Sequence, residues 1–513
     1  MKTPAAGFLF LCATGLATAT PEFLGQAEQQ LLTDRLFQTN LRGPRWTGND
    51  NQNTLTALVA NSMIIAGLEV DTLNYTIYQW DAQWWSLSFT LKNGTKLGIP
   101  TTGYWPYSGN SGLRGITAPV MDAGTFGMFP NMDADPSTLN LTRFPPSGAI
   151  IFFDNPSPTH NYSEPGYQLL GTSRDIGAAA IPELGNLTNP HWQSAKTLNW
   201  TALREMGVVG AISSWVHTSD EDAALQFLPD DGAPGATELF DVPALYVGNS
   251  TGEMIRGLLR ADQVLTADLV LYAPSTFSPT QTVIGHLDGA ANTNATIILY
   301  THSDGPSIIE ENGPILLLTM AEYFATLKPQ LNLNLDFVVT TGHMSGHHLN
   351  ESLWMAERPD LLANAVYAVS CEHFGALEWK DQIVDGEPVY QATGNLEPMW
   401  TMANASHASD FLHQSYLDAF DGTPDSLRMA MVSPGRLNGS RSMWYGVGGS
   451  GTLGRSNIPT IGIIPQPDYL WAAMVDGGWS KLDIPTVVAQ INVIIELIQT
   501  LDSNWAQDHP ESI

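Results

Sequence analysis

Residues 296–327 read TIILYTHSDGPSIIEENGPILLLTMAEYFATL, and this stretch decides the fold class. The apolar run Thr296–Tyr300 predicts a buried strand, and Pro314–Leu327 predicts a helix with proline in its first turn. The alternation continues through a further strand, helix and strand: Leu335–Thr340, Ser352–Leu362 and Ala365–Ser370. Apolar strands that alternate with helices predict an α/β fold, in which a mostly parallel, mixed sheet is sandwiched by helices.

Segments at both ends of the chain extend this pattern. Ile458–Ile464 predicts another strand, and Ile484–Leu501 predicts an amphipathic helix. Residues 51–66 predict a helix that ends at a glycine, and strands are expected over Asp71–Tyr78 and Ser86–Leu91. The α/β domain therefore draws on the N-terminal and C-terminal parts of the chain.

The middle of the chain has a different character. A Gly-, Pro- and Asn-rich stretch over 103–146 indicates a domain boundary. Short apolar runs separated by turns then predict strands over Ala149–Phe153, Val208–Ile212 and Ala244–Val247. We predict an inserted β-rich domain over 115–275, between the two parts of the α/β domain, 20–114 and 276–513.

The N-terminus predicts export. Lys2 precedes the short apolar run 7–16, and Ala17-Thr18-Ala19 is a cleavage site of the A-x-A type, so residues 1–19 are predicted to be a signal peptide. Eleven N-x-S/T sequons fit a secreted, extracellular glycoprotein: Asn74, Asn93, Asn140, Asn161, Asn186, Asn199, Asn249, Asn294, Asn350, Asn404 and Asn438.

Composition excludes several classes of function. The 513 residues carry 21 Lys+Arg against 51 Asp+Glu, a formal net charge of −30. Such a chain lacks the cations that contact phosphates, so we expect no nucleic-acid partner and no binding to an anionic membrane surface. After cleavage Cys371 is the single remaining cysteine, which excludes an intrachain disulfide and a zinc–thiolate site. The oligomeric state does not follow from these data.

Polar residues gather where three predicted strands end. The three stretches are 301–305 (THSDG) followed by Glu310 and Glu311, then 342–348 (GHMSGHH), then 371–375 (CEHFG). The carboxyl ends of parallel strands meet at one edge of a sheet, and imidazole with carboxylate suits zinc. The candidates at these ends are His302, Asp304, Glu310, Glu311, His343, His347, His348, Glu372 and His373.

Two other motifs point to different chemistry. Gly248–Gly252 (GNSTG) matches the serine nucleophile elbow, with Ser250 as the nucleophile, but it overlaps a sequon and lies in the predicted inserted domain. Gly446–Gly451 (GVGGSG) matches a dinucleotide-binding pattern without a βαβ context, so a loop is the expected structure.

The residues at the strand ends resemble those of secreted zinc aminopeptidases with a protease-associated domain, in the clan of glutamate carboxypeptidase and the transferrin receptors. Gly43–Gly48 (GPRWTG) and the helix that ends near Gly67 look like the opening of that family, and 115–275 is similar to a protease-associated domain. The resemblance covers residues 35 to 505 and implies an aminopeptidase-like fold with one or two zinc ions.

The resemblance assigns roles at matching positions. It implies His302 as a ligand with Asp304 as its orienting acid, Glu311 or Glu310 as the bridging carboxylate, and Glu372 as a ligand. The family's Glu-Glu pair of base and ligand is replaced by His343-Met344, and no histidine lies where the last ligand is expected, near 448–454. His343 therefore becomes the candidate acid or base, and His347 and His373 become further candidate ligands.

Three hypotheses remain open from the sequence. The first is a secreted metal-dependent hydrolase that acts on a terminal amide or peptide bond, with a peptide or small amide as substrate. The second is a non-catalytic binding protein that kept the fold. The third is a relative repurposed as an amide hydrolase or cyclase in small-molecule metabolism.

Overall fold

The computed structural model describes most of the chain between residues 22 and 510. The described residues are 22–125, 147–156, 159–160, 167–172, 187–188, 200–216, 218–225, 242–291, 293–345, 349–385, 387–403, 410–421, 423, 427–434, 458–465, 467, 469 and 476–510. Several predictions lie outside these residues: the signal peptide, His347 and His348, the glycine-rich loop 446–451, and the sequons at Asn140, Asn161, Asn186, Asn199, Asn404 and Asn438.

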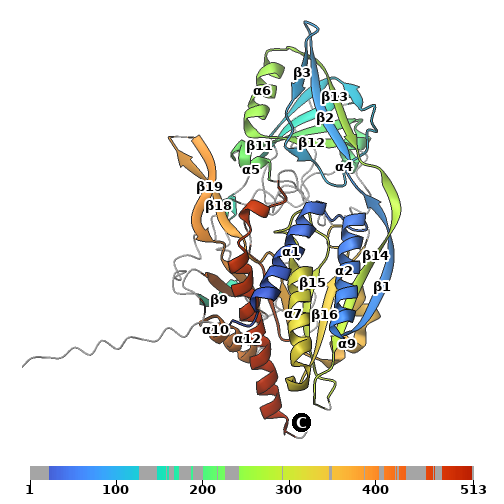
Figure 1. Ribbon diagram of the computed structural model, residues 1–513. Coiled ribbons are helices and arrows are strands. Elements are labelled where there is room, and N and C mark those ends of the chain that lie inside the picture. Colours follow the sequence, from blue (N-terminus) through green and yellow to red (C-terminus); the bar gives the residue numbers. More distant parts are fainter. Residues whose placement is uncertain are drawn as a thin grey trace, which may run out of the picture.

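A nine-stranded mixed sheet forms the centre of the molecule (Figure 1). Its order is β1 (Glu69–Trp80), β14 (Ser275–Leu287), β16 (Asn334–Thr340), β15 (Thr296–His302), β17 (Ala365–Cys371), β22 (Thr460–Ile463), β20 (Met399–Ala403), β21 (Met429–Pro434) and β9 (Tyr167–Thr172). The four strands β16, β15, β17 and β22 are parallel, and antiparallel pairs flank them. The predicted mixed α/β fold is confirmed.

Helices cover both faces of the sheet. Along β15, Ile297 and Leu299 belong to the main core, while Ile298 and Tyr300 face a second core with Trp354. This alternation places a buried layer on each side of the strand. The helices of this part of the molecule are α1 (Gln26–Arg42), α2 (Asp50–Ala66), α7 (Gly313–Leu327), α8 (Leu353–Glu357), α9 (Pro359–Asn364), α10 (Asp410–Asp421), α12 (Ile484–Asp508) and the 3₁₀ turns η5 (Lys328–Gln330) and η8 (Trp479–Lys481).

One helix that the sequence predicts is two helices in the structure. The sequence pattern predicts a single helix over 352–362, whereas the structure has α8 and α9 with a break at Arg358. Pro359 lacks an N–H and disfavours helical geometry in the preceding residue, and Arg358 has φ −124° and ψ 59°. Pro359 then occupies the first turn of α9, where its missing N–H costs nothing.

A distal lobe lies beyond one end of the central sheet, at the top of Figure 1. Its two sheets have the strand orders β4-β12-β11-β7-β6 and β3-β2-β13-β5. Strands β2 to β4 come from residues before 115, so this lobe includes chain that precedes the predicted insertion. Its elements are β2 (Trp84–Leu91), β3 (Lys96–Ile99), β4 (Gly103–Tyr104), β5 (Ile116–Ala118), β6 (Val120–Thr125), β7 (Ile150–Pro156), β11 (Gly210–Val216), β12 (Ala244–Val247), β13 (Val264–Tyr272), α4 (Trp200–Glu205), α5 (Asp220–Ala223) and α6 (Asn249–Arg260).

A hairpin of the central part reaches the distal lobe. Strands β18 (Leu377–Val384) and β19 (Glu387–Leu396) pair antiparallel. Asp381 in β18 accepts hydrogen bonds from the Thr218 hydroxyl at 2.9 Å and the Ser219 N–H at 2.7 Å, just before α5. The remaining short strands, β8 (Thr159–His160) and β10 (Leu187–Thr188), form a two-stranded sheet.

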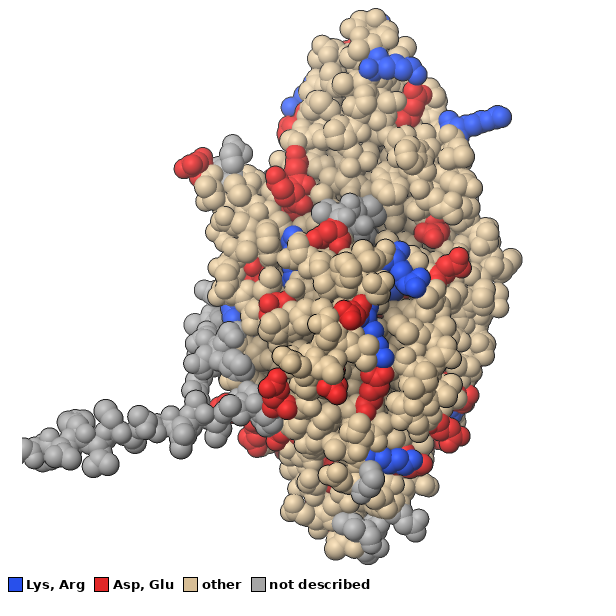
Figure 2. Space-filling view, viewed as in Figure 1, with Lys and Arg blue, Asp and Glu red and all other residues tan. Residues whose placement is uncertain are grey.

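Three features bear on membrane binding, partners and glycosylation. Within the described residues, α12 is the one helix long and apolar enough to cross a membrane, and 67% of its most apolar window is buried inside the protein, as in a core helix. On the face shown in Figure 2 the basic side chains lie scattered among acidic ones. Of the sequon asparagines that the structure describes, Asn74, Asn93, Asn294 and Asn350 are exposed and Asn249 is half-buried.

Candidate metal centre

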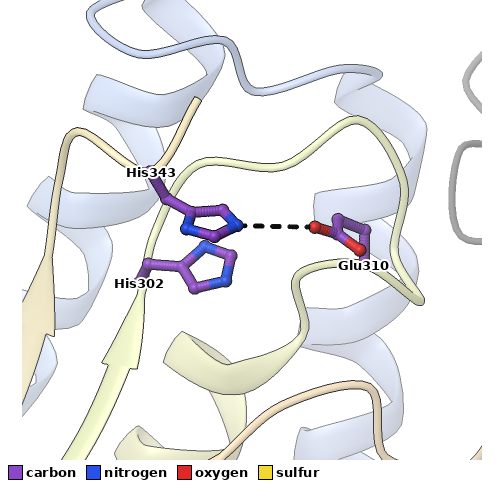
Figure 3. A group of neighbouring side chains, drawn as sticks. All are labelled: His302, Glu310 and His343. Atoms are coloured by element: carbon purple, nitrogen blue, oxygen red, sulfur yellow. Dashed lines mark ion pairs between the residues drawn. The ribbon is translucent and has the colours of Figure 1, made fainter. Parts of the chain in front are cut away.

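The polar strand ends converge as parallel topology requires. His302 is the last residue of β15, His343 follows β16, and Glu372 and His373 follow β17. The imidazole rings of His302 and His343 stack with their centroids 3.8 Å apart. Figure 3 shows these two rings beside Glu310, which comes from the loop between β15 and α7. His302, Glu310 and His343 each offer a ligand atom, and the three atoms lie within 4.8 Å of one another.

Three histidines of this cluster have Nδ1 held by an oxygen acceptor. Nδ1 of His302 lies 2.8 Å from the Asp304 carbonyl oxygen, and Nδ1 of His373 lies 2.7 Å from the Pro465 carbonyl oxygen. Nδ1 of His343 lies 2.9 Å from Oε2 of Glu351. A carbonyl oxygen can only accept, so Nδ1 carries the proton in His302 and His373. In the neutral ring this tautomer leaves the lone pair of Nε2 for a metal, the arrangement that metal-binding histidines usually show.

Carboxylates surround these Nε2 atoms. Oε1 of Glu310 lies 3.8 Å from Nε2 of His343, and Oε2 of Glu310 lies 3.1 Å from Nε2 of His373. Oε2 of Glu372 lies 3.4 Å from Nε2 of His302. Glu311 sits on the other side of His302, with Oε2 2.6 Å from Nδ1. Glu310 therefore lies between His343 and His373, and Glu311 lies on the Nδ1 side of His302.

Buried atoms without hydrogen bonds indicate what the cluster fits. Nε2 of His302, Nε2 of His373, Oε2 of Glu310 and Oε2 of Glu311 are buried and make no hydrogen bond. The 3.1 Å approach of Glu310 to His373 is thus a close contact without hydrogen-bond geometry. Each of these atoms has an ionisable group of the cluster 2.6–3.4 Å away. Buried polar atoms without hydrogen bonds nevertheless cost free energy, and a shared cation removes that cost. Imidazole nitrogen and carboxylate oxygen are donors that zinc accepts, so these residues fit a zinc ion.

The pKa shifts follow from crowding of acids and imidazoles. Burial by itself lowers the pKa of His302, but Glu311 and Glu372 raise it well above its usual value. Burial raises the pKa of Glu311 to about 7 against the opposing effect of His302. Burial and His302 both lower the pKa of His343, whereas Glu351 and Glu310 bring it to about 9. Imidazolium charge balances the carboxylates here, and a divalent cation supplies the same balance without those protons.

Asp304 ties two loops together. Its Oδ2 accepts the N–H of Met344 at 2.8 Å, the N–H of Gly342 at 3.2 Å and the hydroxyl of Thr47. Its contact with His302 is made by the backbone carbonyl. The structure therefore places the Asp304 carboxylate where it holds the loop of His343 over the end of β15. The role of Asp304 as an orienting acid remains a prediction.

Arg45 fixes the loop that carries Glu310 and Glu311. Its Nη2 donates to the carbonyl oxygens of Ser307 at 2.6 Å and Glu311 at 2.8 Å, and its backbone pairs with Gly305. Burial lowers the pKa of Arg45 to about 10, while the carboxylates of Glu311, Asp304 and Glu310 act against this. The buried cation lies beside three acids and reduces their mutual repulsion.

No sequence pattern predicts a place in the site for Glu351 or the function of Arg45. Arg45 belongs to the GPRWTG segment, yet it lies 266 residues before Glu311 along the chain, and no local pattern links the two. Glu351 follows a sequon asparagine in a polar stretch and looks like a surface residue. One feature of the sequence points to the contact between His343 and Glu351: the two residues are only eight positions apart after β16.

Ser250 occupies the first turn of a regular helix. Gly248 is the N-cap of α6, and the Ser250 hydroxyl and N–H both bond to the Asp220 carboxylate. A nucleophile elbow holds its serine in a strained turn, and Ser250 has no positive φ. We expect Ser250→Ala to leave any hydrolytic activity within about twofold of the wild type. A loss of hydrolysis in a folded Ser250→Ala variant, measured beside Glu372→Ala, would support a serine hydrolase.

Comparisons with known proteins place the fold. No family model matches the chain, and no curated protein matches it. Several solved structures do match it. A peptidase M28 precursor from Shewanella amazonensis has a TM-score of 0.59 at 12% identity, over 93% of this chain and 97% of that one. An aminopeptidase from Aneurinibacillus sp. strain AM-1 has 0.56 at 13%, over 94% and 95%. BSAP, a zinc aminopeptidase from Bacillus subtilis, has 0.55 at 14%, over 92% and 95%.

The chain has the fold of the zinc aminopeptidases. The likeness spans nearly the full length of each protein, so the distal lobe is included in the aligned portion. At such low identity the likeness shows the fold alone.

Proposed function

We propose that this protein is a secreted, metal-dependent hydrolase that acts on a terminal amide or peptide bond. The observation that carries the proposal is the set of buried, unbonded Nε2 and carboxylate oxygen atoms where three parallel strands end. In a cluster without a ligand, the buried Nε2 atoms of His302 and His373 would stay without hydrogen bonds at a cost in free energy. The neighbours of the fold support the reaction class, since one is an aminopeptidase from Aneurinibacillus and another is a zinc aminopeptidase from Bacillus subtilis.

His302, Glu310 and His343 are the residues we assign to the ion, with Glu372 and His373 beside them as further ligands. When bound, zinc supplies Lewis acidity toward a carbonyl oxygen and lowers the pKa of water. Arg45 and Asp304 keep the ligand loops in place. The side chain of His343 is 27% exposed whereas that of Glu310 is 4% exposed, so the cluster opens to solvent on the side of His343.

His343 is a candidate both for a metal ligand and for the acid or base, and one variant distinguishes these two roles. The sequence favours it as the acid or base, whereas the structure groups it with His302 and Glu310. As a ligand, which is the role we propose, His343→Ala loses metal and activity together. As a base, His343→Ala retains the metal and loses activity alone.

The proposed reaction is tested by a hydrolysis screen. Aminoacyl anilides, dipeptides and simple N-terminal amides are offered to zinc-loaded protein from pH 4 to 9, with and without a chelator. We expect release of a terminal amine that the chelator abolishes and added zinc restores. Metal-loaded protein that is inert toward the whole panel would contradict the hydrolase and would favour a non-catalytic binding protein.

A further inference from the structure

The carboxylate of Glu351 lies on the Nδ1 side of His343 and is not part of the candidate ligand set. Oε2 of Glu351 is 2.9 Å from Nδ1 of His343, and the Tyr300 hydroxyl donates to Oε1 of the same carboxylate. The Tyr300 hydroxyl also lies 3.1 Å from Oγ1 of Thr340. A chain of hydrogen bonds therefore runs from the ends of β15 and β16 to Nδ1 of His343.

The backbone is shaped to bring these two side chains together. Gly342 has φ +106°, and a Cβ there would lie 3.1 Å from the Leu349 carbonyl oxygen and 3.3 Å from the Glu351 nitrogen. The Ser345 hydroxyl donates to the Leu349 carbonyl oxygen at 2.8 Å and accepts the Leu349 N–H at 3.2 Å. The chain before Glu351 thus returns against the start of the loop, which fixes the distance between the carboxylate and the imidazole.

We propose that Glu351 is a positioning residue of the metal centre, which holds His343 with Nδ1 protonated and presents the lone pair of Nε2 to the ion. This inference rests on the proposed function. A carboxylate in this position orients the ring and makes the ligating nitrogen more basic. The hydrogen bond from Tyr300 to the other carboxylate oxygen keeps Glu351 in the orientation that reaches Nδ1.

The test measures zinc affinity of metal-free protein by competition with a chromophoric chelator. Glu351→Gln keeps the size of the side chain and removes the charged acceptor. We expect zinc to bind this variant about 10- to 100-fold more weakly than the wild type, the usual effect of such a partner. Asp336→Asn is the matched control, because buried Asp336 bonds Nδ1 of His286 at 2.6 Å away from the cluster. We expect the control to bind zinc like the wild type.

Two further measurements separate positioning from a general structural effect. Glu351 acts through His343, so adding Glu351→Gln to His343→Ala should cost no further affinity, whereas independent effects would add. The cobalt-loaded protein should change its visible absorption spectrum in Glu351→Gln and keep it in Asp336→Asn, because the spectrum reports the orientation and donor strength of the ligands, here His343.

The outcomes that overturn the inference are distinct from failure of the proposed function. Wild-type affinity in Glu351→Gln, or additive losses in the double variant, would overturn the role of Glu351 and leave the hydrolase standing. A wild type that binds no zinc would overturn both. Where Glu351→Gln does not fold, Tyr300→Phe removes only the supporting hydroxyl. It should weaken zinc binding about two- to tenfold, and unchanged affinity would overturn the inference.

Discussion

Glu310→Gln is expected to lose zinc and hydrolytic activity together. Glu310 stands between Nε2 of His343 and Nε2 of His373, at 3.8 Å and 3.1 Å, and Gln offers one neutral oxygen in place of two charged ones. Loss of a partner outside the ligand set usually costs 10- to 100-fold in affinity, so loss of a central ligand should exceed about 100-fold. Elemental analysis and kcat/KM of the purified variant measure both effects.

Glu397→Gln is the matched control for that experiment. Glu310 and Glu397 are each 3% exposed, so both variants replace an equally buried carboxylate by an amide. Glu397 lies at the base of the β18–β19 hairpin, where its N–H bonds to the Ala376 carbonyl oxygen. We expect Glu397→Gln to keep its zinc at pH 7. Equal zinc content in the two variants would contradict the assignment of Glu310.

The same Glu397 should make folding stability depend on pH. Burial raises the pKa of its carboxyl from 4.5 to about 8, Glu378 adds to this, and Lys380 and Arg428 oppose it. The folded state therefore keeps a proton that the unfolded chain releases, so this stabilisation is complete below pH 4.5 and is lost as the pH rises to about 8. A pKa difference of this size corresponds to about 5 kcal/mol in total, of which about 4 kcal/mol is lost between pH 4.5 and 8.5.

Chemical denaturation of wild type and Glu397→Gln at several pH values measures this effect. The amide does not titrate, so the unfolding free energy of the variant relative to the wild type should rise by about 4 kcal/mol between pH 4.5 and 8.5. Other titrating groups are common to both proteins and cancel in the difference. A difference that stays constant across this range would show that Glu397 is ionised in the folded protein.

The sequence predicts the central part of the fold because its strands are buried on both sides. Thr296–Tyr300 and Leu335–Thr340 are continuous apolar runs, and the structure extends them only by one or two residues, to β15 and β16. The β18–β19 hairpin was not predicted, since its strands mix charged, polar and apolar residues without a clear period. The break between α8 and α9 was missed because the apolar pattern runs on through Pro359.

The sequence predicts which residues gather at the candidate site, but it predicts their contacts with one another only in part. Strand ends identify His302, His343, Glu372 and His373, because parallel topology brings them together whatever the loops do. Glu310 lies beside His343 and His373, whereas Glu311 lies beside His302. This difference depends on the conformation of the loop before α7, which Arg45 holds through hydrogen bonds to backbone carbonyl oxygens. Hydrogen bonds that join residues hundreds of positions apart leave no pattern in a single sequence.

Metal content tests the central claim most directly. The protein is expressed, purified without chelators or affinity metals, and analysed for metals by mass spectrometry beside His302→Ala and Glu310→Gln. The account predicts one or two zinc ions per chain in the wild type and less than one-tenth of that in each variant. Metal-free wild type that also fails to take up added zinc would contradict it.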